Sequence, residues 1–397
     1  MTPQSTNGRP ESRCIFLFLA FLWGWSYYLV APYLAAPTYA DLEMPLGDQL
    51  EYLVWKTDSS TYLYFLVATL AAFLVGLLLS LRATSFGNGL PTERTAVPTP
   101  SLVAWLTLIA LSLLLAYSYY DIRDALFKGY AAIAWDERND SKALMSGCNI
   151  LLSFLTVYYL AGGHKIARGY SALLLVNSIM LLGLGGRMYV LCAMIAVFGL
   201  FVSVHGINWR KILYVVLFGL LMLVIGLMRQ DDSVSWYSLF FIFLGEPSLN
   251  WLGAGNFLTG NSIGYFEAPL ELLAAIAGFV PTIIWPGKFE FLANFSLEDS
   301  FYFFSPVGGS NFISNFLSNF GWVGSVIAIG MLGYFGGRLT NASFRSNFGL
   351  AVFLVFASLL PFMFFRDPLT IYIKNMFFNG VILPFVVIFL DDKLAWR

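Results

Sequence analysis

The sequence predicts an all-α polytopic membrane protein, and three observations support that fold class. Of the 397 residues, 58% are hydrophobic and only 11% are charged, whereas soluble domains carry about 25% charged residues. The mean hydropathy is +0.73, and apolar runs of about 20 residues, the length of a bilayer-spanning helix, recur along the chain. The charged residues are too few to cover a soluble surface, so we expect lipid to cover most of it.

The composition also argues against several classes of function. The net charge is −1 and no basic tract is present, so we expect no nucleic-acid partner. Cys14, Cys148 and Cys192 lie in apolar segments without metal-ligand spacing, and the two histidines, His164 and His205, are far apart in the sequence. We therefore predict no metal site and no disulfide framework. No nucleotide-binding fingerprint occurs, and we expect no cofactor.

Apolar runs of helix length predict ten membrane spans. Their approximate ranges are 14–34, 61–81, 102–119, 144–162, 170–185, 188–204, 212–228, 312–336, 348–365 and 371–390. Two shorter apolar stretches, 234–244 and 270–285, flank a segment at 246–269 that is predicted to be a loop. These two stretches are interpreted as a re-entrant pair, as interfacial helices or as two further spans, which gives 10–12 transmembrane helices in all.

The first span follows a short N-terminal segment that carries Arg9 and Arg13. Its apolar run is longer than the core of a signal peptide, so we interpret it as an uncleaved anchor. With the N-terminus in the cytoplasm, the short connections HKIARG, GINWRK and FGGRL are also cytoplasmic, in accord with the positive-inside rule. Both termini are then cytoplasmic.

The outer connections are long, at about 35–60, 120–143, 229–271 and 286–311. We treat residues 1–397 as a single integral membrane domain, in which residues 229–311 form a large outer loop region that includes re-entrant or interfacial helices. Long outer loops are where we expect the functional site.

Three arginines are predicted at outer helix ends, where positive charge is disfavoured. Arg187 follows LLGLGG, Arg229 ends the seventh predicted span at GLMRQDD, and Arg366 ends the ninth at FMFFRDP. Any one of them is explained equally well as an anchor that reaches the lipid headgroups. Three on one side favour a shared site, and the guanidinium fork suits a phosphate. We therefore predict a pyrophosphate-lipid site.

The stretch SNFISNFLSNFGWVG at 310–324 repeats serine, asparagine and phenylalanine every four residues. Asn311, Asn315 and Asn319 therefore share one helix face. One interpretation is a polar seam that packs against a neighbouring helix. The other is a wet cleft whose amides bind sugar hydroxyls, in which Asn311, with Ser310 beside it, lies at the outer end.

Four further residues of the outer loops are candidates for the site. Glu246 is an acid in an apolar context and is our candidate general base. Asp231 and Asp232 are alternatives for that role, although neutralising Arg229 would also explain them. Lys288 could add charge for a phosphate, but an interfacial lysine is the commoner explanation.

Taken together, these segments resemble the bacterial O-antigen polymerase (Wzy-type) family of oligosaccharide repeat-unit polymerases. The likeness rests on GLGGRMYVL at 183–191, the helix end at Arg229, FVPTIIWPGK at 279–288, GGSNFISNFLSNFGWVG at 308–324 and RDP at 366–368. It spans most of the chain in topology, but its motifs are short.

The resemblance implies a GT-C-like glycosyltransferase of the bacterial inner membrane, active at the periplasmic face. Its substrates would be oligosaccharides on undecaprenyl pyrophosphate, without a cofactor, and a chain-length regulator would be a partner. By position, the family's pyrophosphate-binding arginines correspond to Arg187, Arg229 and Arg366. Fixed cations there would stabilise the charge that develops on a departing diphosphate.

Two alternatives stay open. O-antigen ligases share much of the pattern, but in them a histidine stands where this chain has Ser310, and no histidine is predicted on the outer side. A polysaccharide-lipid flippase or another secondary transporter should place charges near mid-membrane on discontinuous helices. No internal repeat is evident here, and the unusual charges gather at one predicted surface.

Overall fold

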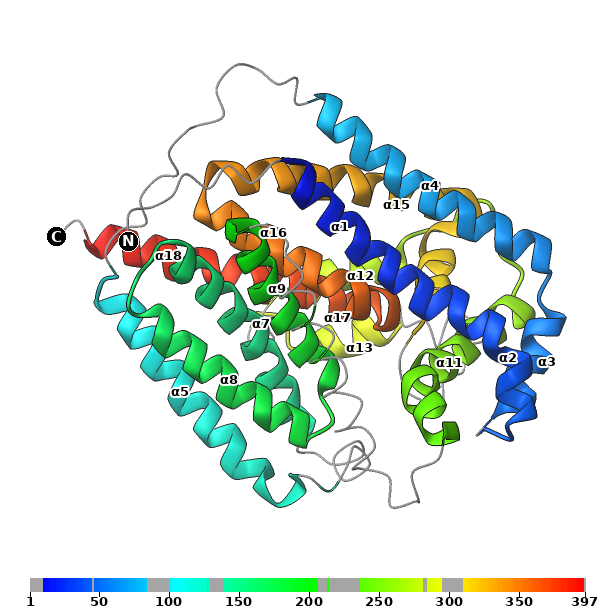
Figure 1. Cartoon of the computed structure of the whole chain (residues 1–397), viewed down its shortest axis with the longest axis horizontal. Coiled ribbons are helices and arrows are strands. Elements are labelled where there is room, and N and C mark those ends of the chain that lie inside the picture. The colour runs from blue at the N-terminus through cyan, green and yellow to red at the C-terminus, as the bar shows by residue number, and fades with distance from the viewer. Residues whose placement is uncertain are drawn as a thin grey trace.

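Figure 1 shows the computed structural model of the chain, in which every described element is a helix. The structure describes residues 10–44, 46–83, 100–126, 128, 139–205, 213, 217, 236–280, 284–294 and 310–395. The α-helices are α1 (Pro10–Trp25), α2 (Ala31–Asp41), α3 (Gly47–Lys56), α4 (Ser59–Ala83), α5 (Leu102–Ile122), α7 (Asn139–Ala161), α8 (Ala167–Gly183), α9 (Arg187–His205), α11 (Trp236–Gly260), α12 (Leu270–Ala277), α13 (Lys288–Ala293), α15 (Phe312–Arg345), α16 (Asn347–Leu359), α17 (Leu369–Ile373) and α18 (Leu383–Ala395). A 3-10 turn, η2 (Arg123–Ala125), and three π-helical segments, η1 (Ser26–Val30), η3 (Leu360–Phe364) and η4 (Lys374–Ile382), complete them.

The all-α polytopic membrane fold is confirmed. Seven helices are long and apolar enough to cross a membrane, and two shorter apolar helices, Ala167–Gly183 and Arg187–Ser203, accompany them. These nine helices coincide with nine of the ten predicted spans. The tenth, 212–228, lies outside the described residues apart from positions 213 and 217.

The region between residues 236 and 293 differs from the sequence prediction. Helix α11 runs unbroken for 25 residues and carries Pro247 inside it, so the predicted loop at 246–269 is wrong for residues 246–260. Ser248 and Trp251 on α11 are buried, and a single sequence does not distinguish a buried polar helix from a polar loop. Helix α12 has only 8 residues, or roughly 12 Å, which is too short to cross a bilayer.

Helices α7 and α16 form the centre of the bundle. Within their most apolar windows, 78% of α7 and 89% of α16 is buried inside the protein, against 22% of α5. Asparagines tie the central helices together: Asn177 Nδ2 on α8 donates to Asn149 Oδ1 on α7 at 3.0 Å, and Asn149 Nδ2 donates to the Tyr189 carbonyl on α9 at 2.9 Å. Apolar packing alone gains little between helices in lipid, so such bonds help to fix their register.

Helix ends that the sequence assigns to the same side do lie together. Arg13, at the start of α1, donates to Ser343 near the end of α15, 2.8 Å from its carbonyl. Ser101, which caps α5, donates its backbone N–H to Asp391 near the end of α18 at 2.8 Å, and Tyr159 near the end of α7 donates to the same carboxylate at 3.0 Å. All five residues belong to ends predicted to face the cytoplasm.

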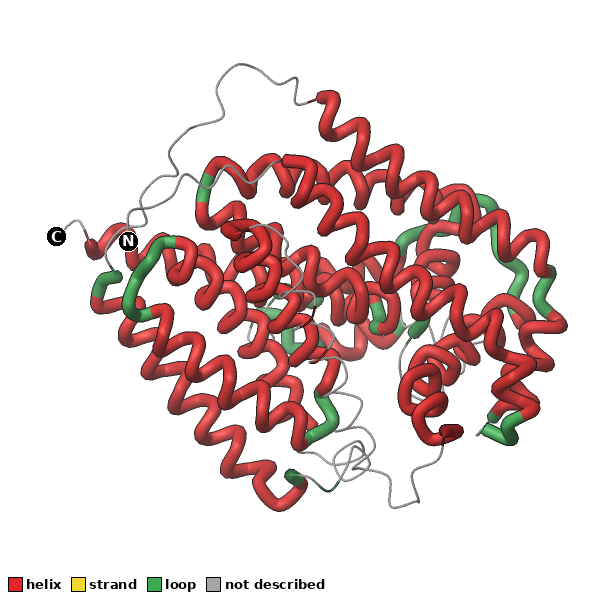
Figure 2. The backbone as a smooth tube through the Cα atoms, in the orientation of Figure 1, coloured by secondary structure: helices red, strands yellow, loops and turns green. Residues whose placement is uncertain are grey.

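Helices α4 and α15 run side by side and parallel (Figures 1 and 2). Glycines allow their backbones to touch. A Cβ added at Gly76 would overlap the Gly330 carbonyl, and one at Gly333 would overlap the Phe73 carbonyl. Small residues are the usual means of close helix packing in lipid, and here they hold the long α15 in place.

Helix α15 is interrupted at Gly321, whose φ is +68°. In place of helical bonds, the backbone N–H of Trp322 donates to the Gly264 carbonyl at 3.0 Å, and that of Val323 donates to the Tyr265 carbonyl at 2.9 Å. A side chain at position 321 would meet this strap, and the positive φ also favours glycine. The predicted polar face of 310–320 is therefore a separate half-helix.

Replacing Gly333 with leucine should separate α4 from α15, because the new side chain would occupy the position of the Phe73 carbonyl. We expect a loss of at least about 1–3 kcal/mol of stability, measured as a lower thermal midpoint in detergent. Gly287→Leu is the matched control, since an added Cβ there meets nothing within 4 Å. Equal midpoints for the two variants would contradict this account of the interface.

Candidate functional site

Three of the predicted site residues come together where several helices end. Arg366 follows η3 and precedes α17, and its Nε lies 2.6 Å from Glu246 Oε1 on α11. Its Nη1 donates to Asp367 Oδ1 at 2.8 Å and lies 3.9 Å from Met188 Sδ, the residue next to Arg187. We call Arg187, Glu246, Arg366 and Asp367 the charged cluster.

Burial and ion pairing determine the protonation of this cluster. The Arg366 side chain is 19% exposed, that of Asp367 6% and that of Glu246 34%. Burial lowers the pKa of Arg366, but the carboxylates of Glu246 and Asp367 outweigh it and raise that pKa above its ordinary value. Burial raises the pKa of Asp367, and the Arg366 charge opposes this only in part. The guanidinium therefore stays charged, and Asp367 binds a proton more readily than an exposed aspartate.

Arg187 is placed by a glycine turn. The Leu184 N–H donates to Met180 O at 3.1 Å and the Gly186 N–H to Leu181 O at 2.7 Å, with Gly185 at φ +83°. Arg187 then begins α9, half-buried and close enough to Tyr27 to interact with it electrostatically. Within the part of the chain that the structure describes, its guanidinium makes no ion pair or hydrogen bond. It is thus the cation of the cluster whose charge no described carboxylate neutralises.

Two of the three π-helical segments border the cluster. Tyr27 and Tyr28 belong to η1, and the Tyr27 hydroxyl donates to the Phe243 carbonyl on α11 at 2.5 Å. Segment η3 ends two residues before Arg366. An extra residue in a helical turn re-aims the following side chains, and such turns are frequent at functional sites.

Asparagine side chains hold the backbone of the cluster at residues 366–367 through hydrogen bonds. Asn250, one turn after Glu246 on α11, donates to the Arg366 carbonyl at 3.3 Å and accepts from Asn311 Nδ2 at 2.9 Å. Asn315 Nδ2 donates to the Asp367 carbonyl at 2.8 Å. The backbone at residues 366–367 is therefore held by amides from two helices.

Asn311 itself is fully buried and acts as the N-cap of α15, with its Oδ1 accepting from the Ile313 N–H at 2.9 Å. Both of its amide atoms are thus engaged inside the protein, as in the predicted polar seam. In the charged cluster, Glu246 is 34% exposed, Arg366 is 19% exposed and Arg187 is half-buried.

Three buried polar atoms on the segments that carry Glu246 and Asn311 have no hydrogen-bond partner among the described residues. They are Ser248 Oγ, Ser310 Oγ and Asn315 Oδ1. An orphaned buried oxygen normally binds water or a ligand. These segments therefore keep hydrogen-bonding capacity that the described residues do not use.

A second polar contact, Glu271–Asn319, supports the loop that carries Arg366. The Glu271 carboxylate accepts from Asn319 Nδ2 at 3.0 Å and from the backbone N–H groups of Leu369 and Thr370 at the start of α17. Burial raises the pKa of Glu271, although these donors oppose the shift. The sequence prediction does not include Glu271. Its position as the lone charged residue of the apolar run ELLAAIA is the feature that would have indicated it.

Another predicted site residue, Lys288, lies on α13. Lys288 begins α13, is buried, and donates from Nζ to the Gly278 carbonyl at 3.2 Å and to the Val280 carbonyl at 2.8 Å. It is therefore tied to the segment after α12. Arg229 and Asp231 lie outside the described residues.

The sequence does not single out Asn250 either, because residues 246–269 are predicted to be a loop. On a helix, Glu246 and Asn250 are four residues apart and share a face. Among the described residues, no group of three or more histidine, cysteine, aspartate or glutamate side chains could hold a metal ion.

No protein-family model, curated protein or solved structure matches this chain.

The raised pKa of Glu271 predicts a pH-dependent stability. A carboxyl whose folded-state pKa is raised stabilises the fold fully below its unfolded pKa, about 4.3, and loses that contribution as pH rises through the folded pKa. We therefore expect the thermal midpoint of the wild-type protein in detergent to decrease as the pH increases through the folded-state pKa of Glu271. Glu271→Gln, which mimics the protonated form, should flatten the fall. The exposed Glu290→Gln is the control, and a slope that Glu271→Gln leaves unchanged would argue against a raised pKa.

Proposed function

We propose that this chain is a glycosyltransferase that polymerises oligosaccharide repeat units carried on undecaprenyl pyrophosphate, as in the Wzy-type family that it resembles. The observation that carries the proposal is the charged cluster, in which Arg366 is locked by Glu246 and Asp367 while Arg187 beside it has no described counter-charge. The proposal includes a GT-C-like architecture, a bacterial inner-membrane location, an active periplasmic face and a chain-length regulator as partner.

A diphosphate would bind to the cluster by replacing a carboxylate as the partner of Arg366. The cluster carries two guanidinium and two carboxyl groups, so its net charge is near zero and it does not attract anions strongly at rest. Glu246, the more exposed of the two acids, is the one that a phosphate would displace from Arg366. Arg187 would bind the same diphosphate, since no described residue occupies its guanidinium fork.

The displaced Glu246 is then free to act as the general base. In the reaction, a hydroxyl of one lipid-linked repeat attacks the anomeric carbon of another lipid-linked chain. A glycosidic bond forms, the bond from the anomeric carbon to the diphosphate oxygen breaks, and Glu246 takes the hydroxyl proton. The diphosphate leaves with its electron pair, and the two arginines stabilise that charge.

An O-antigen ligase would use a different acceptor at the same kind of site. The position before Asn311, which is histidine in the ligase pattern, is Ser310 here, and it is buried. This favours the polymerase over the ligase.

One observation favours a second candidate, a secondary transporter for lipid-linked glycans. Helix α15 is discontinuous at Gly321, and the buried acid Glu271 contacts its first half through Asn319. Broken helices with buried polar groups are common in transporters. Against this candidate, Arg187, Arg366 and Asp367 of the charged cluster lie at helix ends, whereas Glu246 stands midway along α11.

The polymerase proposal predicts extension of lipid-linked repeats by the purified protein. Detergent-solubilised chain incubated with undecaprenyl-pyrophosphate-linked repeat unit should yield a ladder of longer chains and free undecaprenyl pyrophosphate. A strain without the gene should keep core oligosaccharide bearing a single repeat. Loss of all attached repeats with accumulation of lipid-linked polymer would indicate a ligase. Protein-dependent movement of intact lipid-linked repeat across liposomes, without extension, would indicate the transporter.

Arg366→Lys and Arg187→Lys should each lower the rate of extension by about 10²-fold or more, as expected when one stabilising donor of a developing anion is lost. Lysine keeps the charge but not the paired geometry. Arg338→Lys is the matched control, because Arg338 is exposed near the opposite end of α15. Full activity in both cluster variants would refute the proposed role of the arginines.

A further inference from the structure

We infer that a second pocket, lined by Lys56, Asp58, Thr61, Thr259 and Trp322, binds a saccharide ring. The inference rests on the proposed function in one respect only, namely that the saccharide belongs to the glycan on which the enzyme acts. The pocket has a volume of about 300 Å³, and Thr57, Tyr62 and Leu258 complete its lining. That volume is at the small end of ligand pockets.

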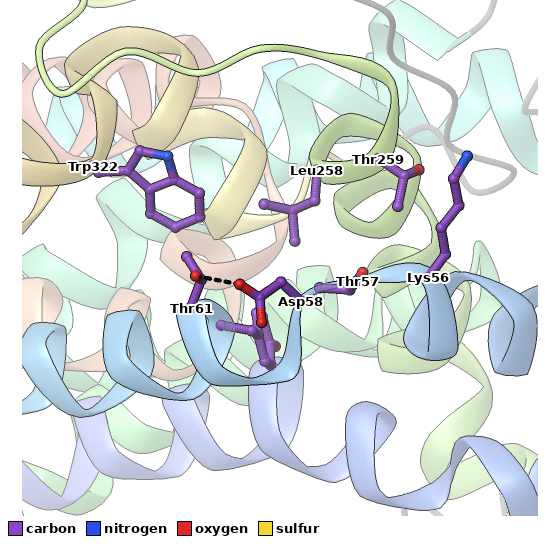
Figure 3. Close-up of a pocket in the computed structure, with 8 residues that line it drawn as sticks. Lys56, Thr57, Asp58, Thr61, Leu258, Thr259 and Trp322 are labelled. Atoms are coloured by element: carbon purple, nitrogen blue, oxygen red, sulfur yellow. Dashed lines mark hydrogen bonds between the residues drawn. The ribbon is translucent and has the colours of Figure 1, made fainter.

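Three distant segments build the pocket (Figure 3). The junction of α3 and α4 supplies Lys56 to Tyr62, the end of α11 supplies Leu258 and Thr259, and the break in α15 supplies Trp322. In the close-up, Trp322 stands on one side, Thr259 and Lys56 on the other, and Asp58 with Thr61 between them. The break at Gly321 therefore places Trp322 directly after the interruption of α15 and beside the N-terminal end of α4.

The walls of the pocket are rigid. The Trp322 ring packs edge-on against Phe65, with ring centroids 5.3 Å apart. Tyr62 is fixed by accepting from Trp251 Nε1 at 2.9 Å and donating to the Leu29 carbonyl at 2.8 Å. A preformed wall loses little conformational entropy when a ligand binds.

The polar groups offer both acceptors and donors. The Asp58 carboxylate accepts from the Thr61 hydroxyl at 2.6 Å and from the Ser60 hydroxyl at 2.7 Å. These bonds lower its pKa to about 2, so it is an ionised acceptor at neutral pH. Among the described residues, the Thr259 hydroxyl donates only to carbonyls of its own helix, at 2.8 Å and 3.4 Å, so its oxygen remains available as an acceptor. Lys56 is exposed and supplies a flexible donor.

This combination fits a sugar better than a diphosphate. One lysine and one aspartate give the lining no net charge, whereas a diphosphate needs a surplus of cations. The Trp322 face suits the apolar C–H face of a pyranose ring, and the hydroxyl and carboxylate groups suit its hydroxyls.

The pocket is separate from the charged cluster but linked to it through α11. Glu246 and Leu258 are 12 residues apart on this helix, or roughly 18 Å. A saccharide held here would lie more than one ring from the diphosphate, so the pocket would align the glycan chain and not the reacting bond.

The test is binding of free oligosaccharide to the purified full-length chain in detergent, measured by titration calorimetry. The probe is the repeat-unit oligosaccharide released from its lipid diphosphate by mild acid. We expect wild type and Arg366→Lys to bind alike, because the probe carries no phosphate. Trp322→Ala and Thr259→Val should bind at least about tenfold more weakly, which corresponds to about 1.4 kcal/mol. Trp105→Ala, which removes a half-exposed tryptophan from α5, should bind as wild type does.

The outcomes separate this inference from the proposed function. Absence of binding by folded wild type, or equal binding by wild type, Trp322→Ala and Thr259→Val, would overturn the pocket assignment. Displacement of the probe by inorganic pyrophosphate would overturn the saccharide class in favour of a diphosphate. Trp322→Ala also removes a packing contact with Phe65 and so can impair folding. Thr259→Val leaves that contact intact and therefore tests the pocket independently. Extension of lipid-linked repeats, assayed on the same preparations, reports on the polymerase independently.

Discussion

Burial of Arg366 among apolar helix ends is the constraint on which the site depends. An isolated charge in such a setting is strongly disfavoured, so the guanidinium must have close counter-charges. Glu246 from α11 and the adjacent Asp367 supply them. Because Glu246 comes from a distant helix, this pairing ties α11 to the end of the α16–η3 segment. The amides of Asn250 and Asn315 then fix the backbone on either side.

The interruption of α15 at Gly321 divides this helix into two halves with different roles. Before Gly321, the half-helix is polar and buried, and it supports the loop of Arg366 through Asn315 and Asn319. After Gly321, glycines pack the helix against α4 along its length. One helix therefore serves a polar site at one end and a close apolar interface at the other. The residues 264–265 that bridge the break satisfy its free N–H groups, which lipid is unable to do.

In the proposed function, the cluster and the pocket would bind two parts of a lipid-linked glycan. Guanidinium groups suit a diphosphate, whereas an aromatic wall with balanced charge suits a sugar. Helix α11 contributes to both, with Glu246 and Asn250 in one and Leu258 and Thr259 in the other. A rigid element that spans two sites holds them at a fixed separation, and a fixed separation is what the positioning of an elongated substrate requires.

The sequence alone determined the fold class and the positions of the nine described apolar helices, because hydrophobic length is a local property. It also marked Arg187 and Arg366 as unusual, since charge at a helix end predicted to face outward is rare. Only the tertiary structure decided their partners. The spacing from Glu246 to Asn250 predicts a shared face only when the segment is known to be helical, and the apolar context that buries α11 comes from helices far away in the sequence. Trp322 shows the same limit: its place beside Asp58 depends on a positive φ at Gly321 and on the parallel packing of α4 and α15, and both are set by contacts between distant segments.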